Sequence, residues 1–155
     1  MKKLSLSLLC LMAAGQLLFA EALPASKDPA VQEKADKQMQ MQNTEVVRVV
    51  VEELSKKLPQ KVDKYTTFTN IRAKDLNLIY TYEINTGAKS DEAVKKEDRS
   101  RMKQGVTYGV CRTSKRFLDS KIVLTYRYTS AKSKNELFKF VITPKECADI
   151  WAGLK

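Results

Sequence analysis

The sequence predicts an α+β fold: an antiparallel sheet of about four strands in the order α-β-β-α-β-β-α, with the helices layered on one face and one disulfide. Apolar residues recur at helical spacing in some segments and alternate with polar residues in three others, and a fourth segment is rich in threonine and β-branched residues. Short turns separate these four predicted strands into two pairs, which is typical of antiparallel hairpins. Helices that cover one face of such a sheet form a two-layer domain.

Residues 1–22 have the pattern of a secretory signal peptide. A basic start and an apolar run, residues 4–19, are followed by a small-x-small triplet. The run is shorter than the roughly 20 apolar residues that a membrane-spanning helix needs. We expect cleavage after Ala22 or Ala20, and therefore a periplasmic or secreted protein that is not an integral membrane protein. Cys10 lacks the small preceding residue of a lipidated cysteine, so no lipid anchor is expected.

Beyond the leader, residues 23–43 are expected to form a flexible or weakly helical lead-in, and residues 44–155 a single α+β domain. Apolar residues at i, i+3, i+4 and i+7 within residues 47–58 predict an amphipathic helix. Thr44 is a candidate N-cap for it, and Pro59 ends it.

Four segments are predicted strands. Tyr65–Arg72 is rich in threonine and β-branched residues. The other three, Leu76–Ile84, Ile122–Thr129 and Leu137–Thr143, alternate apolar and polar residues as half-buried strands do. Pro144 ends the last strand, and residues 145–154 predict a short C-terminal helix.

A charged, helix-prone segment, residues 89–103, separates the two strand pairs, with Ser90 as its predicted N-cap. The stretch from Lys95 to Arg101 lacks apolar residues, and the first half of the helix is expected to project into water. Gly105 and Gly109 follow with the spacing G-x-x-x-G, which we interpret as close packing of the helix on the sheet.

The chain has a formal net charge of +10 at pH 7, and its most basic region is the end of this helix and its exit. In an exported protein the partner is expected to be an envelope protein or an anionic envelope polymer, not nucleic acid. The region is either a docking surface for that partner or a solvated face. Its candidate residues are Arg99, Arg101, Lys103, Arg112, Lys115 and Arg116.

Cys111 and Cys147 remain after the leader, and an even pair in an oxidising compartment predicts a disulfide. Such a bond stabilises a fold by about 3–4 kcal/mol in the chain-entropy model. The alternative, a redox or metal pair, usually needs C-x-x-C spacing or histidines, and the sequence has no histidine. No metal and no cofactor are expected.

The motif L-x-Y-x-Y occurs at Leu78 and again at Leu124, through an old duplication or through convergence of two strands. Strand alternation places its four tyrosines on one side of the sheet. They form either a platform for a sugar or peptide ligand, or part of the core, since both leucines share their face. These tyrosines are Tyr80, Tyr82, Tyr126 and Tyr128.

Catalytic residue sets are not recognisable. Without histidine, neither a Ser-His-Asp nor a Cys-His arrangement can form. The carboxylate pairs Glu52/Glu53 and Asp91/Glu92 are adjacent in sequence, so their side chains diverge on a helix. We expect a protein that is not an enzyme, with an envelope hydrolase as the enzymatic alternative.

Several short motifs together resemble a largely uncharacterised family of small exported bacterial (periplasmic) proteins. They are Leu58-Pro59, Val62-Asp63 with Thr66, the two L-x-Y-x-Y repeats, Cys111, and Phe140-x-Ile142-Thr143 before Cys147, and the likeness covers about residues 44–150. In size, export and single disulfide the chain is also loosely similar to the pilotins of type II secretion, which guide outer-membrane secretins. Pilotins are typically lipoproteins, and this chain departs from them because it lacks a lipidation site.

These observations predict a non-enzymatic periplasmic protein, a binding or assembly accessory of the bacterial cell envelope, for which the resemblance adds a link to secretion. The alternative is a secreted inhibitor or immunity protein that blocks an exported enzyme. A small, rigid domain crosslinked by a disulfide is suited to either role.

Overall fold

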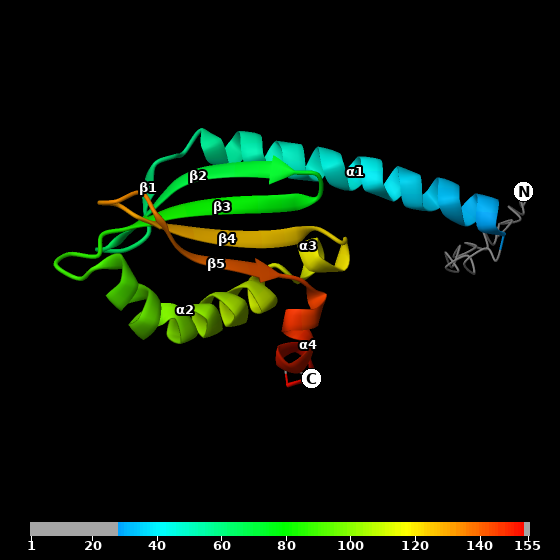
Figure 1. Cartoon of the computed structure of the whole chain (residues 1–155). Helices are drawn as coiled ribbons and strands as arrows, with labels where there is room; N and C mark the ends of the chain where they lie inside the picture. Colours follow the sequence, from blue (N-terminus) through cyan, green and yellow to red (C-terminus); the bar gives the residue numbers. More distant parts are fainter. Residues whose placement is uncertain (1–27, 154–155) are drawn as a thin grey trace, which may run out of the picture.

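The computed structural model describes residues 28–153 (Figure 1). The predicted signal peptide and its cleavage sites lie outside the described residues. The helices are α1 (Pro29–Ser55), α2 (Asp91–Thr113), α3 (Lys115–Asp119) and α4 (Pro144–Ala152). The strands are β1 (Gln60–Lys61), β2 (Thr66–Lys74), β3 (Asn77–Ile84), β4 (Val123–Ser130) and β5 (Glu136–Ile142).

The five strands form one mixed sheet in the order β1-β2-β3-β4-β5. Neighbouring strands are antiparallel except β3 and β4, which are parallel. The predicted α+β class, the two hairpins and the disulfide are confirmed. The sheet differs from the prediction in two respects, because it has a fifth strand and one parallel pair. The parallel pair arises because α2 and α3 carry the chain back past the sheet before β4 begins, as a crossover connection does.

Helix α1 begins earlier than the periodic apolar pattern does. Asp28 is its N-cap, with a carboxylate oxygen 2.9 Å from the backbone N–H of Ala30, and Pro29 occupies the first turn, where its missing N–H is harmless. Residues 29–43, expected to be flexible or weakly helical, are therefore helical. Residues 29–42 are all exposed, and Val47 is the first buried position of the helix.

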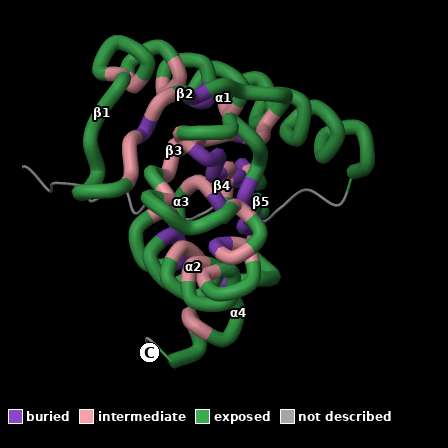
Figure 2. Tube along the Cα trace, turned by 60° about the vertical axis from the view of Figure 1, so that its left-hand side comes forward, coloured by how far each residue is buried: buried purple, intermediate pink, exposed green. Residues whose placement is uncertain are grey.

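Three rows of side chains cross one face of the sheet and form most of the core. Helices α1 and α2 cover opposite margins of this face: α1 runs along β2 and α2 along β5, with β3 and β4 between them (Figures 1 and 2). The rows are Phe68, Tyr82, Tyr128 and Phe138; Ile71, Tyr80, Tyr126 and Phe140; and Leu78, Leu124 and Ile142.

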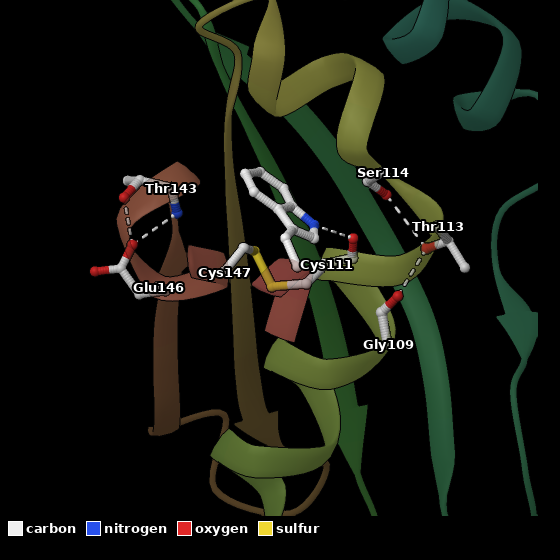
Figure 3. The surroundings of a disulfide bond; sticks show 8 residues. Gly109, Cys111, Thr113, Ser114, Thr143, Glu146 and Cys147 are labelled. Atoms are coloured by element: carbon white, nitrogen blue, oxygen red, sulfur yellow. Dashed lines mark hydrogen bonds between the residues drawn. A yellow bond between two sulfur atoms is a disulfide. The ribbon is translucent and has the colours of Figure 1, made fainter. Parts of the chain in front are cut away.

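A disulfide between Cys111 and Cys147 joins the end of α2 to α4 across 36 residues of sequence (Figure 3). Both cysteines are buried, and the indole N–H of Trp151 donates to the Cys111 carbonyl oxygen at 2.7 Å. The side chains of Thr143 and Glu146 form a capping box that begins α4. The C-terminal helix is thus fixed to α2 by covalent, polar and apolar contacts.

Replacing both cysteines, as Cys111→Ala/Cys147→Ala, should lower the free energy of unfolding by about 3–4 kcal/mol, because the unfolded chain gains the freedom of an open loop. Urea titration of the variant and of the oxidised wild-type protein measures the difference. A loss below about 1 kcal/mol would contradict a structural role for the bond.

Candidate functional site

The parallel register of β3 and β4 aligns the two L-x-Y-x-Y repeats residue for residue. Leu78 lies opposite Leu124, Tyr80 opposite Tyr126 and Tyr82 opposite Tyr128. We call the strip of sheet between α1 and α2 the tyrosine groove, with these four tyrosines as its floor. The four tyrosines therefore form two adjoining cross-strand pairs on one side of the sheet, as the sequence predicted.

The rings of the floor are stacked. The centroids of Tyr80 and Tyr126 are 5.1 Å apart with 12° between the planes, and those of Tyr82 and Tyr128 are 5.1 Å apart with 21°. Tyr82 also stacks on Phe68 of β2 at 4.9 Å. Offset stacking at these separations is favourable beyond the area it buries. The floor is therefore a continuous aromatic surface across β2, β3 and β4.

The floor is packed, yet it is not closed. Tyr128 is buried, with 7% of its surface exposed, whereas Tyr80, Tyr82 and Tyr126 remain partly exposed. Within residues 28–153, none of the four hydroxyl groups has a hydrogen-bond partner. The tyrosines thus serve as core at their base and as an accessible surface above it, and their role as a ligand platform stays a prediction.

Burial raises the pKa of each of the four phenols above the usual value near 10. The pKa of Tyr128 rises to about 12, and those of Tyr82 and Tyr126 rise further. Desolvation is the main cause, and the charge that a neighbouring tyrosine would carry adds to it for these three residues. The four phenols therefore stay protonated and uncharged well above neutral pH, so that each hydroxyl can both donate and accept a hydrogen bond.

Two glycines open the α2 side of the groove. A hollow of about 260 Å³ lies between α2 and β4 and is lined by Gly105, Val106, Gly109, Val110, Thr113 and Tyr126. A Cβ atom added at Gly105 or Gly109 would meet no atom within 4 Å. The prediction that these glycines pack closely on the sheet is wrong, because the space beside them is open. They leave the backbone of α2 accessible from the groove.

A larger hollow, about 570 Å³, lies where the loop before β2 faces the first half of α2. Its apolar lining comes from Ile84, Val94, Met102 and Phe138, and Tyr65 is an exposed aromatic at its mouth. Charged residues surround it: Asp63, Lys64, Lys89, Asp98 and Arg101. Sequence analysis placed Arg101 in the basic series and Asp63 in a family motif, but it did not bring these residues together, since they come from three elements and two loops.

The predicted basic surface is an exposed series along α2 and α3. Arg101 pairs with Asp98 at 2.6 Å, and Lys115 pairs with Asp119 at 2.7 Å. Arg112 donates to the hydroxyl of Tyr108 at 3.0 Å. The remaining members, Arg99, Lys103 and Arg116, are exposed. Their role as an anionic-partner surface stays a prediction.

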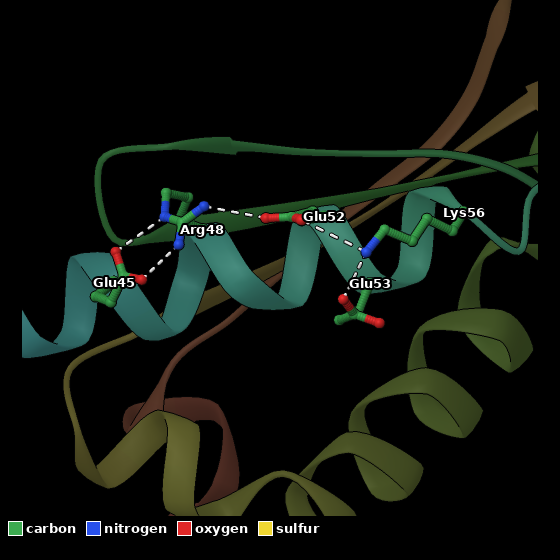
Figure 4. A network of polar contacts seen from close by, with 5 residues as sticks. All are labelled: Glu45, Arg48, Glu52, Glu53 and Lys56. Atoms are coloured by element: carbon green, nitrogen blue, oxygen red, sulfur yellow. Dashed lines mark hydrogen bonds and ion pairs between the residues drawn. The ribbon is translucent and has the colours of Figure 1, made fainter.

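The adjacent carboxylates Glu52 and Glu53 belong to an ion-pair network on the solvent side of α1 (Figure 4). Arg48 bonds Glu45 and Glu52, and Lys56 bonds Glu52 and Glu53. The hydrogen bond from Arg48 lowers the pKa of Glu45, and that from Lys56 lowers the pKa of Glu53. These carboxylates support the helix surface through i,i+3 and i,i+4 pairs.

The described part of the chain lacks both a metal-binding cluster and a membrane-spanning helix. Residues 28–153 contain no cluster of three or more Cys, Asp or Glu side chains that could hold a metal ion. Over the same residues, no helix combines the length and the apolar character needed to cross a bilayer.

No family model and no curated protein matches this sequence. Solved structures do share its fold. A candidate secreted protein of Pseudomonas aeruginosa superposes with a TM-score of 0.62 at 14% identity, covering 70% of this chain and 96% of that one. The pilotin AspS of the Vibrio cholerae type II secretion system gives a TM-score of 0.56 at 18% identity, over 73% of this chain and 99% of the pilotin.

The pilotin EpsS of the Vibrio vulnificus type 2 secretion system gives a TM-score of 0.54 at 14% identity, over 74% of this chain and 96% of the pilotin. At these identities the likeness is one of fold. The structural resemblance to small exported proteins and to pilotins, expected from the sequence, is confirmed at that level.

The phenols of the floor should ionise late. Because their folded-state pKa values lie above the unfolded value near 10, the stability that they contribute is complete below about pH 10 and is lost as the pH rises through about 12. Phenolate absorbance near 295 nm, followed with urea titrations at rising pH, tests both statements. Tyr126→Phe should remove one of the phenols that ionise at raised pH. Ionisation of all six tyrosines together near pH 10 in the folded protein would contradict the prediction.

Proposed function

We propose that this protein is a non-enzymatic accessory of a bacterial secretion system, acts in the periplasm, and binds an envelope protein in the tyrosine groove. Two of its structural neighbours are pilotins of type II secretion systems, which supports the link to secretion. The open aromatic floor between two helices is the observation that carries the binding role. No observation favours the inhibitor or immunity alternative over this one.

The strip of sheet between α1 and α2 is only partly covered. With α1 along β2 and α2 along β5, Tyr80, Tyr82 and Tyr126 on β3 and β4 keep part of their surface exposed. A sheet face of this kind is stabilised when another element packs on it. An amphipathic helix of the partner that lies above this strip, with its apolar face on the tyrosines, would cover it.

The groove offers both close approach and hydrogen bonds to such a helix. Gly105 and Gly109 let side chains of the partner reach the backbone of α2. The unpaired hydroxyls of the floor can accept or donate hydrogen bonds at the edge of the apolar contact. The 570 Å³ hollow at the α2 end of the groove, with apolar walls and a charged rim, can take a large apolar side chain.

Filling the groove should abolish partner binding without harming the fold. Gly109→Leu places a bulky side chain in open space, and leucine favours a helix over glycine by roughly 1 kcal/mol. Ser100→Leu is the matched control, because position 100 is exposed and nine residues away, on the opposite side of α2. In a deletion strain, wild-type protein and Ser100→Leu should restore release of secretion substrates, and Gly109→Leu should not.

Crosslinking in the envelope supplies the second readout. Wild-type protein and Ser100→Leu should capture a component of the secretion system, whereas Gly109→Leu should lose it by at least about tenfold. Normal secretion in the deletion strain, or equal capture by Gly109→Leu and wild type, would refute the proposal.

A further inference from the structure

The face of the sheet opposite the tyrosine groove carries mostly polar side chains and an excess of cations. Strand alternation places Arg72, Lys74, Arg127 and Lys139 there, because their neighbours Ile71, Ala73, Tyr126, Tyr128, Phe138 and Phe140 point into the core or groove. Lys61 of β1 joins them, since it lies opposite Thr67. We call these five residues the cationic sheet face.

The carboxylates on this face are already paired. Glu136 accepts from the Arg127 guanidinium at 2.7 Å, and Glu83 pairs with Lys134 at 2.9 Å. Within residues 28–153, Lys61, Arg72, Lys74 and Lys139 have no carboxylate within ion-pairing distance. In the basic series on α2 and α3, two of the six residues, Arg101 and Lys115, pair with neighbouring aspartates.

A hollow of about 300 Å³ lies within the cationic sheet face. It is lined by Arg72, Asn77, Ile79, Thr125, Arg127, Glu136 and Lys139. Thr125, 1% exposed, donates its hydroxyl to the amide oxygen of Asn77 at 3.0 Å, which leaves the Asn77 amide N–H groups as donors. Around the hollow stand three cations and one carboxylate, which Arg127 already engages.

Donors that converge on a hollow with a surplus of positive charge suit an oxyanion, and guanidinium groups suit phosphate in particular. We propose that the cationic sheet face binds an anionic lipid surface through its phosphate headgroups, with one headgroup seated in the hollow. A lipid surface fits better than a single soluble phosphate, because the unpaired cations are spread over β1, β2 and β5, about 19 Å apart at the extremes. Several headgroups are needed to reach them all.

Bound in this way, the protein keeps the tyrosine groove directed away from the lipid, since the two lie on opposite faces of one sheet. The lipid interaction is therefore independent of partner binding in the groove, and each can be lost without the other.

Vesicle sedimentation tests the proposal with the chain lacking residues 1–22. The protein should bind vesicles that contain phosphatidylglycerol, not pure phosphatidylcholine vesicles, and added salt should weaken binding because screening reduces the attraction. Arg72→Gln/Lys139→Gln should weaken binding by at least about tenfold. Arg99→Gln/Lys103→Gln removes the same charge from α2 and should change binding by less than about threefold.

Each contrary outcome has a defined meaning. Equal losses in the two double variants would show attraction by net charge alone and overturn the site. Absence of a preference for the anionic vesicles would overturn it as well. Binding of glycerol 1-phosphate in solution without vesicle binding would assign the hollow to a soluble phosphate compound and refute the lipid surface. Circular dichroism and urea titration establish that the variants are folded, and Gly109→Leu should bind vesicles as wild type does, whatever its effect on secretion.

Discussion

The parallel, in-register pairing of β3 and β4 is the constraint on which the rest of the structure depends. It sets Tyr80 beside Tyr126 and Tyr82 beside Tyr128, so that two separate repeats become one aromatic floor. A shift of one residue would turn the tyrosines of the shifted strand to the opposite face. The same pairing requires a crossover, and the crossover is α2, which forms one side of the groove. The parallel pairing of β3 and β4 thus determines both the floor of the groove and the helix at its side.

The disulfide gives that wall its rigidity. Cys111 lies near the end of α2, within the part of the helix that lines the groove, and its bond to Cys147 holds α4 against α2. Trp151 and Lys115 add a hydrogen bond and a cation–π contact at 4.6 Å in the same region. Because these contacts with α4 hold α2 in place, the hollow beside Gly105 and Gly109 can stay open.

Sequence reasoning reached the elements whose signals are local. Alternation within Leu76–Ile84 and Ile122–Thr129 predicted strands, and short turns predicted hairpins, because both depend on neighbouring residues. It could not order the two hairpins, since pairing of β3 with β4 joins residues 46 positions apart. The aligned L-x-Y-x-Y repeats were a usable signal for parallel pairing. Asp28 before Pro29 was likewise a usable start signal for α1.

In the candidate sites, too, sequence reasoning reached the local features and missed those that depend on packing. The tyrosines could be placed on one face from alternation alone, whereas the open space beside Gly105 and Gly109 depends on how α2 lies over β4.

Helix α1 has two halves with different surroundings. Its second half, from Val47, is anchored in the core, while residues 29–42 form a strut about 20 Å long that extends beyond the sheet (Figure 1). Such a strut can fray turn by turn at little free energy while the anchored half stays folded, so its order is decoupled from that of the domain.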